Sequence, residues 1–327
     1  MDLSRTNLVE LPYSIGNLRR LKFMCLNWTK IRDLPKSIWT LENLEELTAK
    51  SSQNFEGEIP SEIARLSQLK ILNLSRSKLS RLPMTINQLS NLRELVLLDC
   101  AKLRLLPDLP TSLTKLELSS SLLKEVPNLS KLTNLLHLDI SDCTFDFKFF
   151  KTTQARVANL NLEWLGRLHE LQILRLVLSD SNLPSTNLSS LTQLRSLEIT
   201  CSDPRSLTQL PSSLEVSSLE DVKTPIEWPM FSNLGNLCEL ELSGCRLREI
   251  EFDHVLGQLE NLQRLQVRMC KRLVRLSNLS SLKELGVLSV EYCPQLIEIE
   301  SQRSSTGGCS STERPIPDTL KLESSGL

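Results

Sequence analysis

The side chains best suited to chemistry in this sequence are its nine cysteine thiols, which could hold a metal ion, form disulfides or act as nucleophiles. Cys245, Cys270 and Cys293 stand out because they follow one another at intervals of 25 and 23 residues. No C-x-x-C pair occurs, however, and the three histidines fall at other places in the repeating pattern described below. We therefore expect no metal and no cofactor, and we interpret the thiols as occupants of a buried position that accepts small residues.

The sequence also lacks the short motifs of catalysis and nucleotide binding. It contains no G-x-S-x-G segment and no G-x-x-x-x-G-K-[ST] phosphate loop, and no histidine has a Ser or Cys partner at a motif spacing. We expect a protein that is not an enzyme and that does not itself bind a nucleotide.

Basic and acidic residues are nearly balanced, at 38 and 39. Nucleic acids and anionic membranes attract a clustered basic excess, so we expect neither as a partner. The chain has no run of 18 apolar residues, and its first thirty residues contain charges where a signal peptide needs an apolar stretch. Five N-x-S/T sequons favour export, but they arise easily in a Ser- and Asn-rich chain. Without paired-cysteine caps, a reducing cytoplasmic or nucleocytoplasmic location is favoured.

A repeated L-x-x-L-x-L pattern defines the elements that must position these residues. We call the central leucine of each copy, or the residue in its place, the register residue. Successive register residues are 20 to 25 residues apart, except for one interval of 36. They are Met1, Met24, Leu47, Leu72, Leu95, Leu116, Leu138, Leu174, Leu197, Ser217, Leu240, Leu265 and Leu288. A period near 23 is typical of leucine-rich repeats.

The L-x-L segment alternates with period two, which predicts a short strand with its leucines on one face. One copy cannot fold alone: about six buried aliphatic side chains contribute roughly 9–18 kcal/mol, whereas ordering 23 backbone residues costs roughly 23–46 kcal/mol. Neighbouring copies must therefore stack. We expect an α/β solenoid, a leucine-rich-repeat horseshoe of about 13 repeats, with a parallel concave β-sheet and an irregular or short-helical convex side.

A small polar or thiol residue lies five residues after the register residue in twelve of the thirteen copies, where the chain leaves the strand. Such residues can hydrogen-bond backbone groups that the turn leaves unpaired, so we expect them to form a buried ladder. The residues at this position are Thr6, Thr29, Ser52, Ser77, Cys100, Ser121, Cys143, Ser179, Ser202, Val222, Cys245, Cys270 and Cys293.

The repeat unit resembles a known family. Its form is Leu-x-x-Leu-x-x-Leu-x-Leu-x-x-(Cys/Ser/Thr)-x-x-Leu-x-x-Leu-Pro-x-x-Ile-x-x-Leu, carried most clearly by residues 6–18, 29–38 and 79–86. Over roughly residues 1–300 it is similar to the leucine-rich repeats of plant intracellular nucleotide-binding (NLR) disease-resistance proteins. Residues 99–113 resemble a form common in the Toll/interleukin-receptor-type branch, whereas residues 55–60 look like the G-x-I-P style of plant extracellular repeats.

The resemblance implies a protein-recognition domain of a plant immune receptor, which senses a pathogen effector or a host guardee and helps to hold the nucleotide-binding domain inactive. That domain is missing from this sequence, so we expect a fragment, a truncated receptor or a repeat-only relative. Two alternatives stay open: a repeat-only scaffold or adaptor protein, and an extracellular receptor ectodomain that would carry glycan at Asn27 or Asn73.

The residues between and just after the strand leucines are not required for the core, and they form the candidate protein-binding surface on the concave face. The alternative interpretation is that the charged residues among them form a solvated face. The candidates are Trp28, Lys50, Arg76, Asp99, Glu117, Asp139, Asp142, Arg175, Leu178, Glu198, Glu220, Asp221, Glu241, Arg268 and Tyr292.

Two expectations follow for this surface. Trp28, Leu178 and Tyr292 are the expected anchors, because large apolar and aromatic side chains dominate interface energies. The acidic residues from Asp99 to Asp142 could attract a basic partner. Reversing the charge of Asp139 and Asp142 should then alter binding and leave thermal unfolding unchanged.

The expected domains are repeats over 1–299 and a disordered tail over 300–327, which is rich in Ser, Gly, Thr and Pro. The long interval contains an insertion at about 143–167 with four phenylalanines: Phe145, Phe147, Phe149 and Phe150. This insertion either docks another domain or ligand, or packs against the core; the sequence favours neither.

Overall fold

The computed structural model describes residues 1–52, 55–56, 58–123, 125–142, 161–178, 183–226, 228–231, 233–252, 259–300 and 321–322. The chain forms two compact units, Met1–Ser181 and Asn182–Leu327. The four phenylalanines of the predicted insertion lie outside the described residues.

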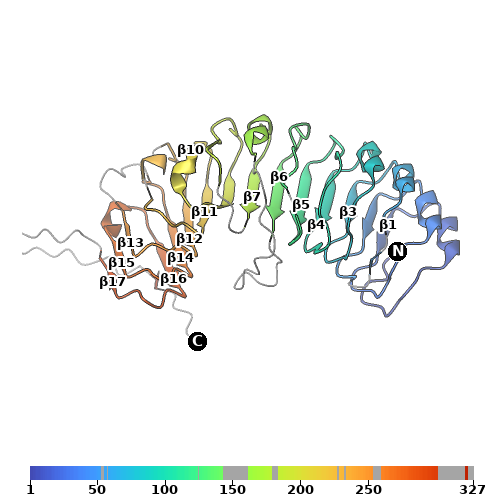
Figure 1. Cartoon of the computed structure of the whole chain (residues 1–327), viewed down its shortest axis with the longest axis horizontal. Helices are drawn as coiled ribbons and strands as arrows, with labels where there is room; N and C mark the ends of the chain where they lie inside the picture. Colours follow the sequence, from blue (N-terminus) through green and yellow to red (C-terminus); the bar gives the residue numbers. More distant parts are fainter. Residues whose placement is uncertain are drawn as a thin grey trace, which may run out of the picture. The chain divides into compact units, whose positions relative to one another are not determined.

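Seven parallel strands form the sheet of the first unit, in sequence order (Figure 1). They are β1 (Phe23–Cys25), β2 (Glu46–Thr48), β3 (Ile71–Asn73), β4 (Glu94–Leu97), β5 (Lys115–Ser119), β6 (His137–Ser141) and β7 (Ile173–Val177). Asp2 forms a parallel bridge with Cys25, which places Met1 in line with Met24. Each register residue is the Cα partner of the next, from Met24 through Leu174. The pairing holds across the interval of 36 residues as well, because the strands alone set the register.

The second unit repeats this plan. Its main sheet contains β9 (Ser196–Thr200), β11 (Val216–Glu220), β12 (Glu239–Ser243), β14 (Arg264–Arg268), β16 (Val287–Glu291) and β18 (Lys321–Leu322). Register residues are again aligned, from Leu197 through Leu288. The strand at β18 falls inside the stretch for which the sequence predicts a disordered tail; the other residues after 300 lie outside the described part.

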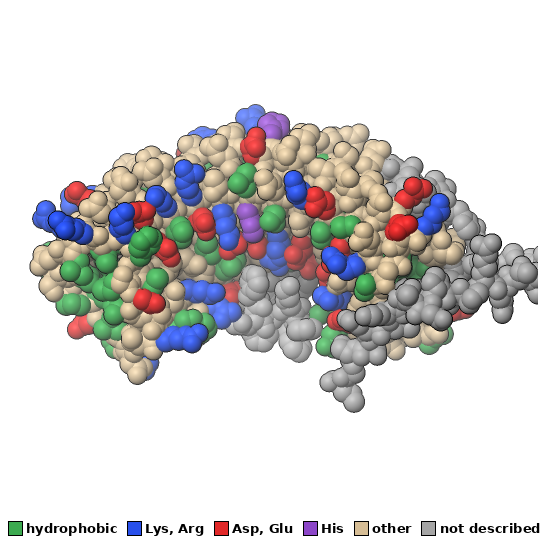
Figure 2. Space-filling view, turned by 180° about the vertical axis from the view of Figure 1, so that it is seen from behind, with side chains coloured by type: hydrophobic (Ala, Val, Ile, Leu, Met, Phe, Trp, Pro, Cys, Tyr) green, Lys and Arg blue, Asp and Glu red, His purple; other side chains and the backbone are tan. Residues whose placement is uncertain are grey.

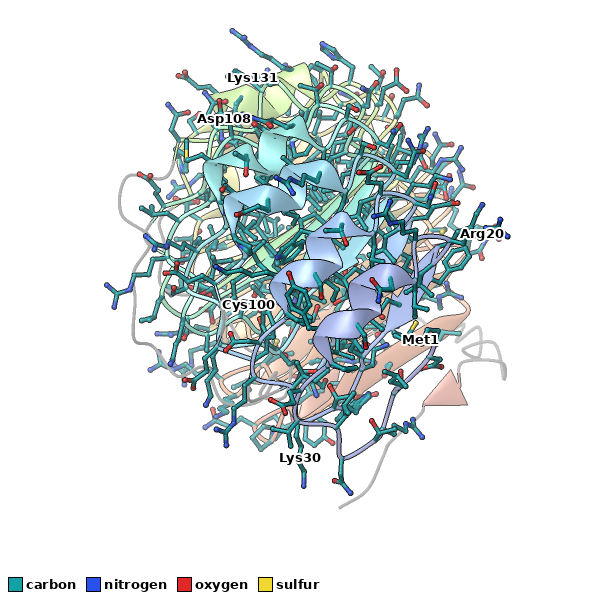
Figure 3. The ribbon with its side chains drawn as sticks, turned by 90° about the vertical axis from the view of Figure 1, so that its right-hand side faces the viewer. Met1, Arg20, Lys30, Cys100, Asp108 and Lys131 are labelled. Carbon is teal, nitrogen blue, oxygen red and sulfur yellow. The ribbon has the colours of Figure 1, made fainter. Side chains whose placement is uncertain are left out.

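Short 3-10 helices follow the strands in the first unit: η1 (Tyr13–Asn17), η2 (Lys36–Thr40), η3 (Ser61–Arg65), η4 (Met84–Gln88) and η6 (Glu163–Arg167). Each of the first four begins after a proline whose φ is between −65° and −78°. A buried isoleucine lies three residues after each of these prolines, and its carbonyl accepts the closing hydrogen bond. The L-P-x-x-I-x-x-L spacing therefore fits three residues per turn and buries one side of each helix. Figure 3 shows these turns stacked one behind another.

In the second unit, the segments that connect the strands of the main sheet also contain short strands. These segments hold η7 (Pro204–Ser206), η8 (Trp228–Phe231) and η9 (Leu279–Ser281), and two small parallel sheets. One sheet pairs β8 (Thr186–Asn187) with β10 (Leu207–Gln209). The other contains β13 (Glu249–Glu251), β15 (Arg275–Ser277) and β17 (Glu298–Ile299).

Asparagine side chains join neighbouring repeats along one edge of the sheet, four residues before the register residue. Each donates from its Nδ2 to a carbonyl of the preceding repeat at 2.6–3.0 Å. These residues are Asn43, Asn91, Asn134, Asn236 and Asn261. This position is not among those predicted above, although its periodicity is visible in the sequence.

The predicted fold class is confirmed: each unit is an open parallel sheet backed by short helical or irregular segments. All helices in the described part are 3-10 helices rather than α-helices. None of them combines the length and hydrophobicity that crossing a bilayer requires.

Candidate protein-binding surface

Alternation along each strand separates a core face from an outward face. In β5, Leu116 and Leu118 are buried, whereas Lys115 and Glu117 are partly exposed. We call the face made by the residues on either side of each register residue, together with the turn residues that follow, the open face. Figure 2 shows charged side chains of both signs interspersed on the face seen there, with hydrophobic side chains gathered at the N-terminal end of the first unit.

The turn after each strand determines which residues reach the open face. The fourth residue after the register residue has a positive φ in nine copies, including Trp28, Arg76, Asp99 and Tyr292. Few L-residues adopt this conformation readily. Here it turns the fourth residue outward in most copies, although Ser51 is buried, and it turns the fifth residue inward. Thr29 Oγ1 and Ser52 Oγ, at this fifth position, lie 3.2 Å apart inside the unit.

The predicted ladder position is buried in seven copies in which the fourth residue has a positive φ: Thr29, Ser52, Ser77, Cys100, Val222, Cys245 and Cys270. At the two ends the prediction fails, because Thr6 is exposed and Cys293 is partly exposed, and Cys143 and Ser179 lie outside the described residues. In two further copies the prediction is wrong by one residue. Ser120 and Cys201 have no positive φ, and they are the fully buried residues in place of Ser121 and Ser202. Ser120 Oγ donates to the Leu103 carbonyl at 2.6 Å. Without the left-handed turn, the fourth residue itself points inward.

Most of the predicted surface residues do reach the open face. Trp28 and Tyr292 are 51% and 61% exposed, and Lys50 is also exposed. A further set is partly exposed: Arg76, Asp99, Glu117, Arg175, Glu198, Glu220, Asp221, Glu241 and Arg268.

Leu178 and Asp142 are corrections to the prediction, because they are only 1% and 7% exposed. Both are fourth residues without a positive φ, so the inward turn described above removes them from the open face. Leu178 is therefore not an anchor.

Asp139 is also buried, at 5% exposure, and its Oδ1 lies 3.0 Å from Arg175 Nη1. The predicted acidic stretch is compensated elsewhere too: Asp99 pairs with Arg76 at 3.2 Å, and Glu117 pairs with Lys115 at 3.0 Å. Asp99 and Asp139 are thus paired with cations of neighbouring repeats, and Glu117 with a cation of its own strand, so these carboxylates do not form a net acidic patch that would steer a basic partner.

His137 lies beside this network, with its Nε2 3.6 Å from Glu117 Oε1. Burial lowers the pKa of His137 below its ordinary value, and the Glu117 carboxylate opposes that effect.

The second unit also balances charges across strands. Arg268 lies 3.6 Å from Glu241 and 3.4 Å from Glu291, each on a neighbouring strand. Arg264 Nη2 lies 2.6 Å from Glu239 Oε2. These pairs link three consecutive strands on the open face.

Phe23 is not among the surface residues predicted from the sequence, although it precedes the register residue of β1 and is 51% exposed. Residues directly before the register residue share the outward face with those directly after it, so the period-two rule alone could have identified it. Phe23 and Trp28 flank the same short strand and give the N-terminal end of the open face two exposed aromatic rings.

Lys22, which directly precedes Phe23 in the sequence, belongs to a group of ion pairs with Glu45 and Lys70. Glu45 accepts hydrogen bonds from Lys70 and Lys22, at 2.6 and 2.9 Å, which lowers the pKa of its carboxyl to about 2. Its negative charge therefore persists through the physiological range and holds both ammonium groups at this edge.

The cysteines that could have formed a metal site lie in the ladder as free thiols. Among the described residues there is no group of three potential ligands with metal-binding geometry. Burial raises the pKa of Cys100 to about 11, and hydrogen bonding to Cys245 raises that of Cys270 to about 12. These thiols stay protonated, which suits a packing role rather than nucleophilic or ligand chemistry.

A polar hollow of about 510 Å³ lies at the sheet edge of the first unit. Arg93, Thr114, Leu136 and Glu170 are among its lining residues. Ser112 and Thr114, which also line it, belong to the shortest repeat interval of the unit.

Comparison with known proteins places residues 52–224 in the family described as the leucine-rich repeat region. Two proteins of Arabidopsis thaliana, both named for disease resistance, are similar to the chain. The first is 29% identical over 71% of this chain and 26% of its own length. The second is 31% identical over 57% of this chain and 15% of its own length. The chain thus spans about a quarter or less of these relatives.

Solved structures share the fold. The functional domain of InlJ from Listeria monocytogenes has a TM-score of 0.56 at 15% identity, over 92% of this chain and 57% of that one. An internalin, InlF, from the same organism has a TM-score of 0.56 at 16% identity, over 91% and 85%.

Proposed function

Since this chain belongs to the leucine-rich-repeat family, we propose that its open face is the protein-recognition surface of a plant disease-resistance protein. The fold is a protein-interaction scaffold, and the relatives named for disease resistance support the biological setting. The observation that carries the proposal is the pair of exposed aromatic rings, Phe23 and Trp28, on the open face of β1.

The finer parts of the proposal rest on the repeat form. The partner would be a pathogen effector or a host guardee, and within a longer receptor the surface would also contact the nucleotide-binding domain. The setting would be cytoplasmic or nucleocytoplasmic, in a receptor of the Toll/interleukin-receptor-type branch. Exposed aromatic side chains beside ordered charges are the residue types that dominate protein interfaces.

The test is a binding measurement with purified pathogen effectors, followed by substitution at the rings. For an effector that binds, Phe23→Ala and Trp28→Ala should each weaken the Kd about tenfold or more, because aromatic anchors contribute most of the interface energy. Tyr13→Ala is the matched control: Tyr13 is an exposed aromatic residue in η1, away from the open face, and its loss should leave the Kd unchanged. Equal effects at all three positions would contradict the assignment of the open face.

A further inference from the structure

The polar hollow of the first unit lies where strands β4 to β7 begin, outside the open face. Two rows of residues line it, which lie four and two positions before the register residues of these strands. The first row is Asn91, Ser112, Asn134 and Glu170, and the second row is Arg93, Thr114 and Leu136. Successive members of a row belong to successive repeats, so the hollow runs across the strands. With strands about 4.8 Å apart, it extends over about 14 Å from the β4 repeat to the β7 repeat.

Two asparagines in the hollow present amide groups that are only partly used in hydrogen bonds. Asn91 donates one Nδ2 proton to the Ser67 carbonyl at 2.8 Å, and Asn134 donates one to the Thr111 carbonyl at 3.0 Å. These bonds hold both amide planes in place. Each amide also has a second Nδ2 proton and an acceptor oxygen, for which the described part of the chain supplies no partner. Each can therefore bind the carbonyl and the N–H of a peptide group.

The two ends of the hollow carry opposite charges. Arg93 lies at the β4 end and Glu170 at the β7 end, and both side chains are exposed. Neither forms an ion pair within the described residues, whereas Asp99 and Glu117 on the open face are both paired. Leu136, between the two ends, is 37% exposed and adds an apolar contact. A ligand that spans the hollow is complementary to it when a carboxylate lies beside Arg93 and a cation lies beside Glu170.

We propose that this hollow is a second protein-contact site, which binds an extended segment of a partner protein across β4 to β7. An extended chain rises about 3.3 Å per residue, so residues four positions apart are about 13 Å from each other, close to the length of the hollow. Side chains alternate with period two, so such residues also lie on the same side of the segment. The recognised segment therefore has an acidic and a basic residue separated by three others, and Asn91 and Asn134 bind its main chain. The proposal does not rest on the partner of the open face.

The test is an NMR titration of the nitrogen-15-labelled chain with two peptides of the same composition. The probe is acetyl-Glu-Thr-Val-Thr-Lys-amide, and the control is acetyl-Glu-Lys-Thr-Val-Thr-amide, in which the charges are adjacent. The probe should shift the side-chain amide signals of Asn91 and Asn134. It should also bind about threefold more tightly than the control, or better, because only the probe reaches both charges. The side-chain amide of Asn261, which donates a similar hydrogen bond outside the hollow, should not shift.

Charge reversals then locate the two ends of the site. Arg93→Glu and Glu170→Lys should each weaken binding of the probe by about three- to tenfold, since each brings like charges together. The double variant should restore binding, because the exchanged charges fit the probe in the opposite chain direction. Arg65→Glu is the matched control, as the same change at an exposed arginine of η3 outside the hollow, and it should leave the Kd unchanged. All these side chains are exposed, so the variants should fold like the parent.

Four results would overturn the proposal. They are an absence of shifts at Asn91 and Asn134 with the probe at millimolar concentration, equal binding of the two peptides, equal effects of Arg93→Glu and Arg65→Glu, and a double variant that binds no better than the single ones. Each of these leaves the assignment of the open face intact, because that assignment is tested at Phe23 and Trp28 with a different ligand.

Discussion

At the scale of single residues, Ser217 is an unfavourable buried group, because it replaces a register leucine. It is fully buried, and in the described part of the chain its Oγ has no hydrogen-bond partner. The sequence identified this copy as the degenerate one, since both its register residue and Val222 depart from the pattern. It could not show that the hydroxyl is unsatisfied, because the partners of a buried group come from other repeats.

Ser217→Ala should therefore stabilise the protein, by about 1 kcal/mol, since it removes a polar group that is buried without a hydrogen bond. Ser120→Ala is the matched comparison. Ser120 is equally buried, but its Oγ donates to Leu103 and accepts from the N–H of Leu122. Its substitution should destabilise by about 1–2 kcal/mol. Chemical denaturation of both variants measures the two effects, and shifts of the same sign would contradict this account.

Asp139 is the residue whose role the structure changes most. The sequence placed it on the binding surface, but it is a buried partner of Arg175. Asp139→Lys should lower the free energy of unfolding by about 3 kcal/mol or more, because it leaves two cations facing each other where a buried pair stood. Lys50→Glu, a charge reversal at an exposed position, should change it by no more than about 0.5 kcal/mol. A thermal melt of Asp139→Lys that matches the parent would restore the original interpretation.

At the scale of elements, the close packing of the 3-10 helices depends on Gly16. A Cβ added there would lie 2.7 Å from Ser37 Cβ and 2.7 Å from the Ser37 carbonyl oxygen, in the next helix. Thr40 Oγ1 donates to the Gly16 carbonyl at 3.3 Å, so the two helices touch along their backbones. The glycine is required by this approach and not by its φ.

Gly16→Ala should destabilise the first unit by about 1–3 kcal/mol, because backbone and short side chains cannot move aside without strain. Gly235→Ala is the control, since a Cβ there meets no atom within 4 Å. It should be neutral, or stabilising by up to about 1 kcal/mol through the unfolded state. Thermal unfolding of the two variants tests the packing, and equal melting temperatures would refute it.

Sequence periodicity predicted the strands well, because an L-x-L segment can bury its leucines in only one orientation. It predicted the turns less well. Whether the residue at position 120 or 121 is buried depends on one backbone dihedral, and Ser and Asp tolerate either conformation. The same dihedral explains why Trp28 is exposed and Leu178 is buried. Because the turn conformation was not predicted, Leu178 was wrongly predicted to lie on the binding surface.

At the scale of the whole molecule, the repeat period was enough to predict the fold, since stacking is the only way for copies this small to bury their leucines. The binding surface followed only in part. Which residues face outward follows from the alternation along each strand, and the sequence shows that alternation. The net charge of the surface depends on ion pairs such as Arg76 with Asp99 and Arg175 with Asp139, whose members are 23 and 36 residues apart in the chain. Those pairs become visible only once the register is fixed.

The aligned register also gives each sheet a fixed pitch, whatever the length of the repeats behind it. Strands lie about 4.8 Å apart. A peptide in the polyproline-II conformation rises about 3.1 Å per residue and presents every third side chain on the same face. A peptide crossing the strands would therefore come back into phase after about three residues and two strands. Within either unit, the open face therefore presents side chains at a regular spacing. A partner peptide with suitable side chains at every third residue would match that spacing without a change in its backbone conformation.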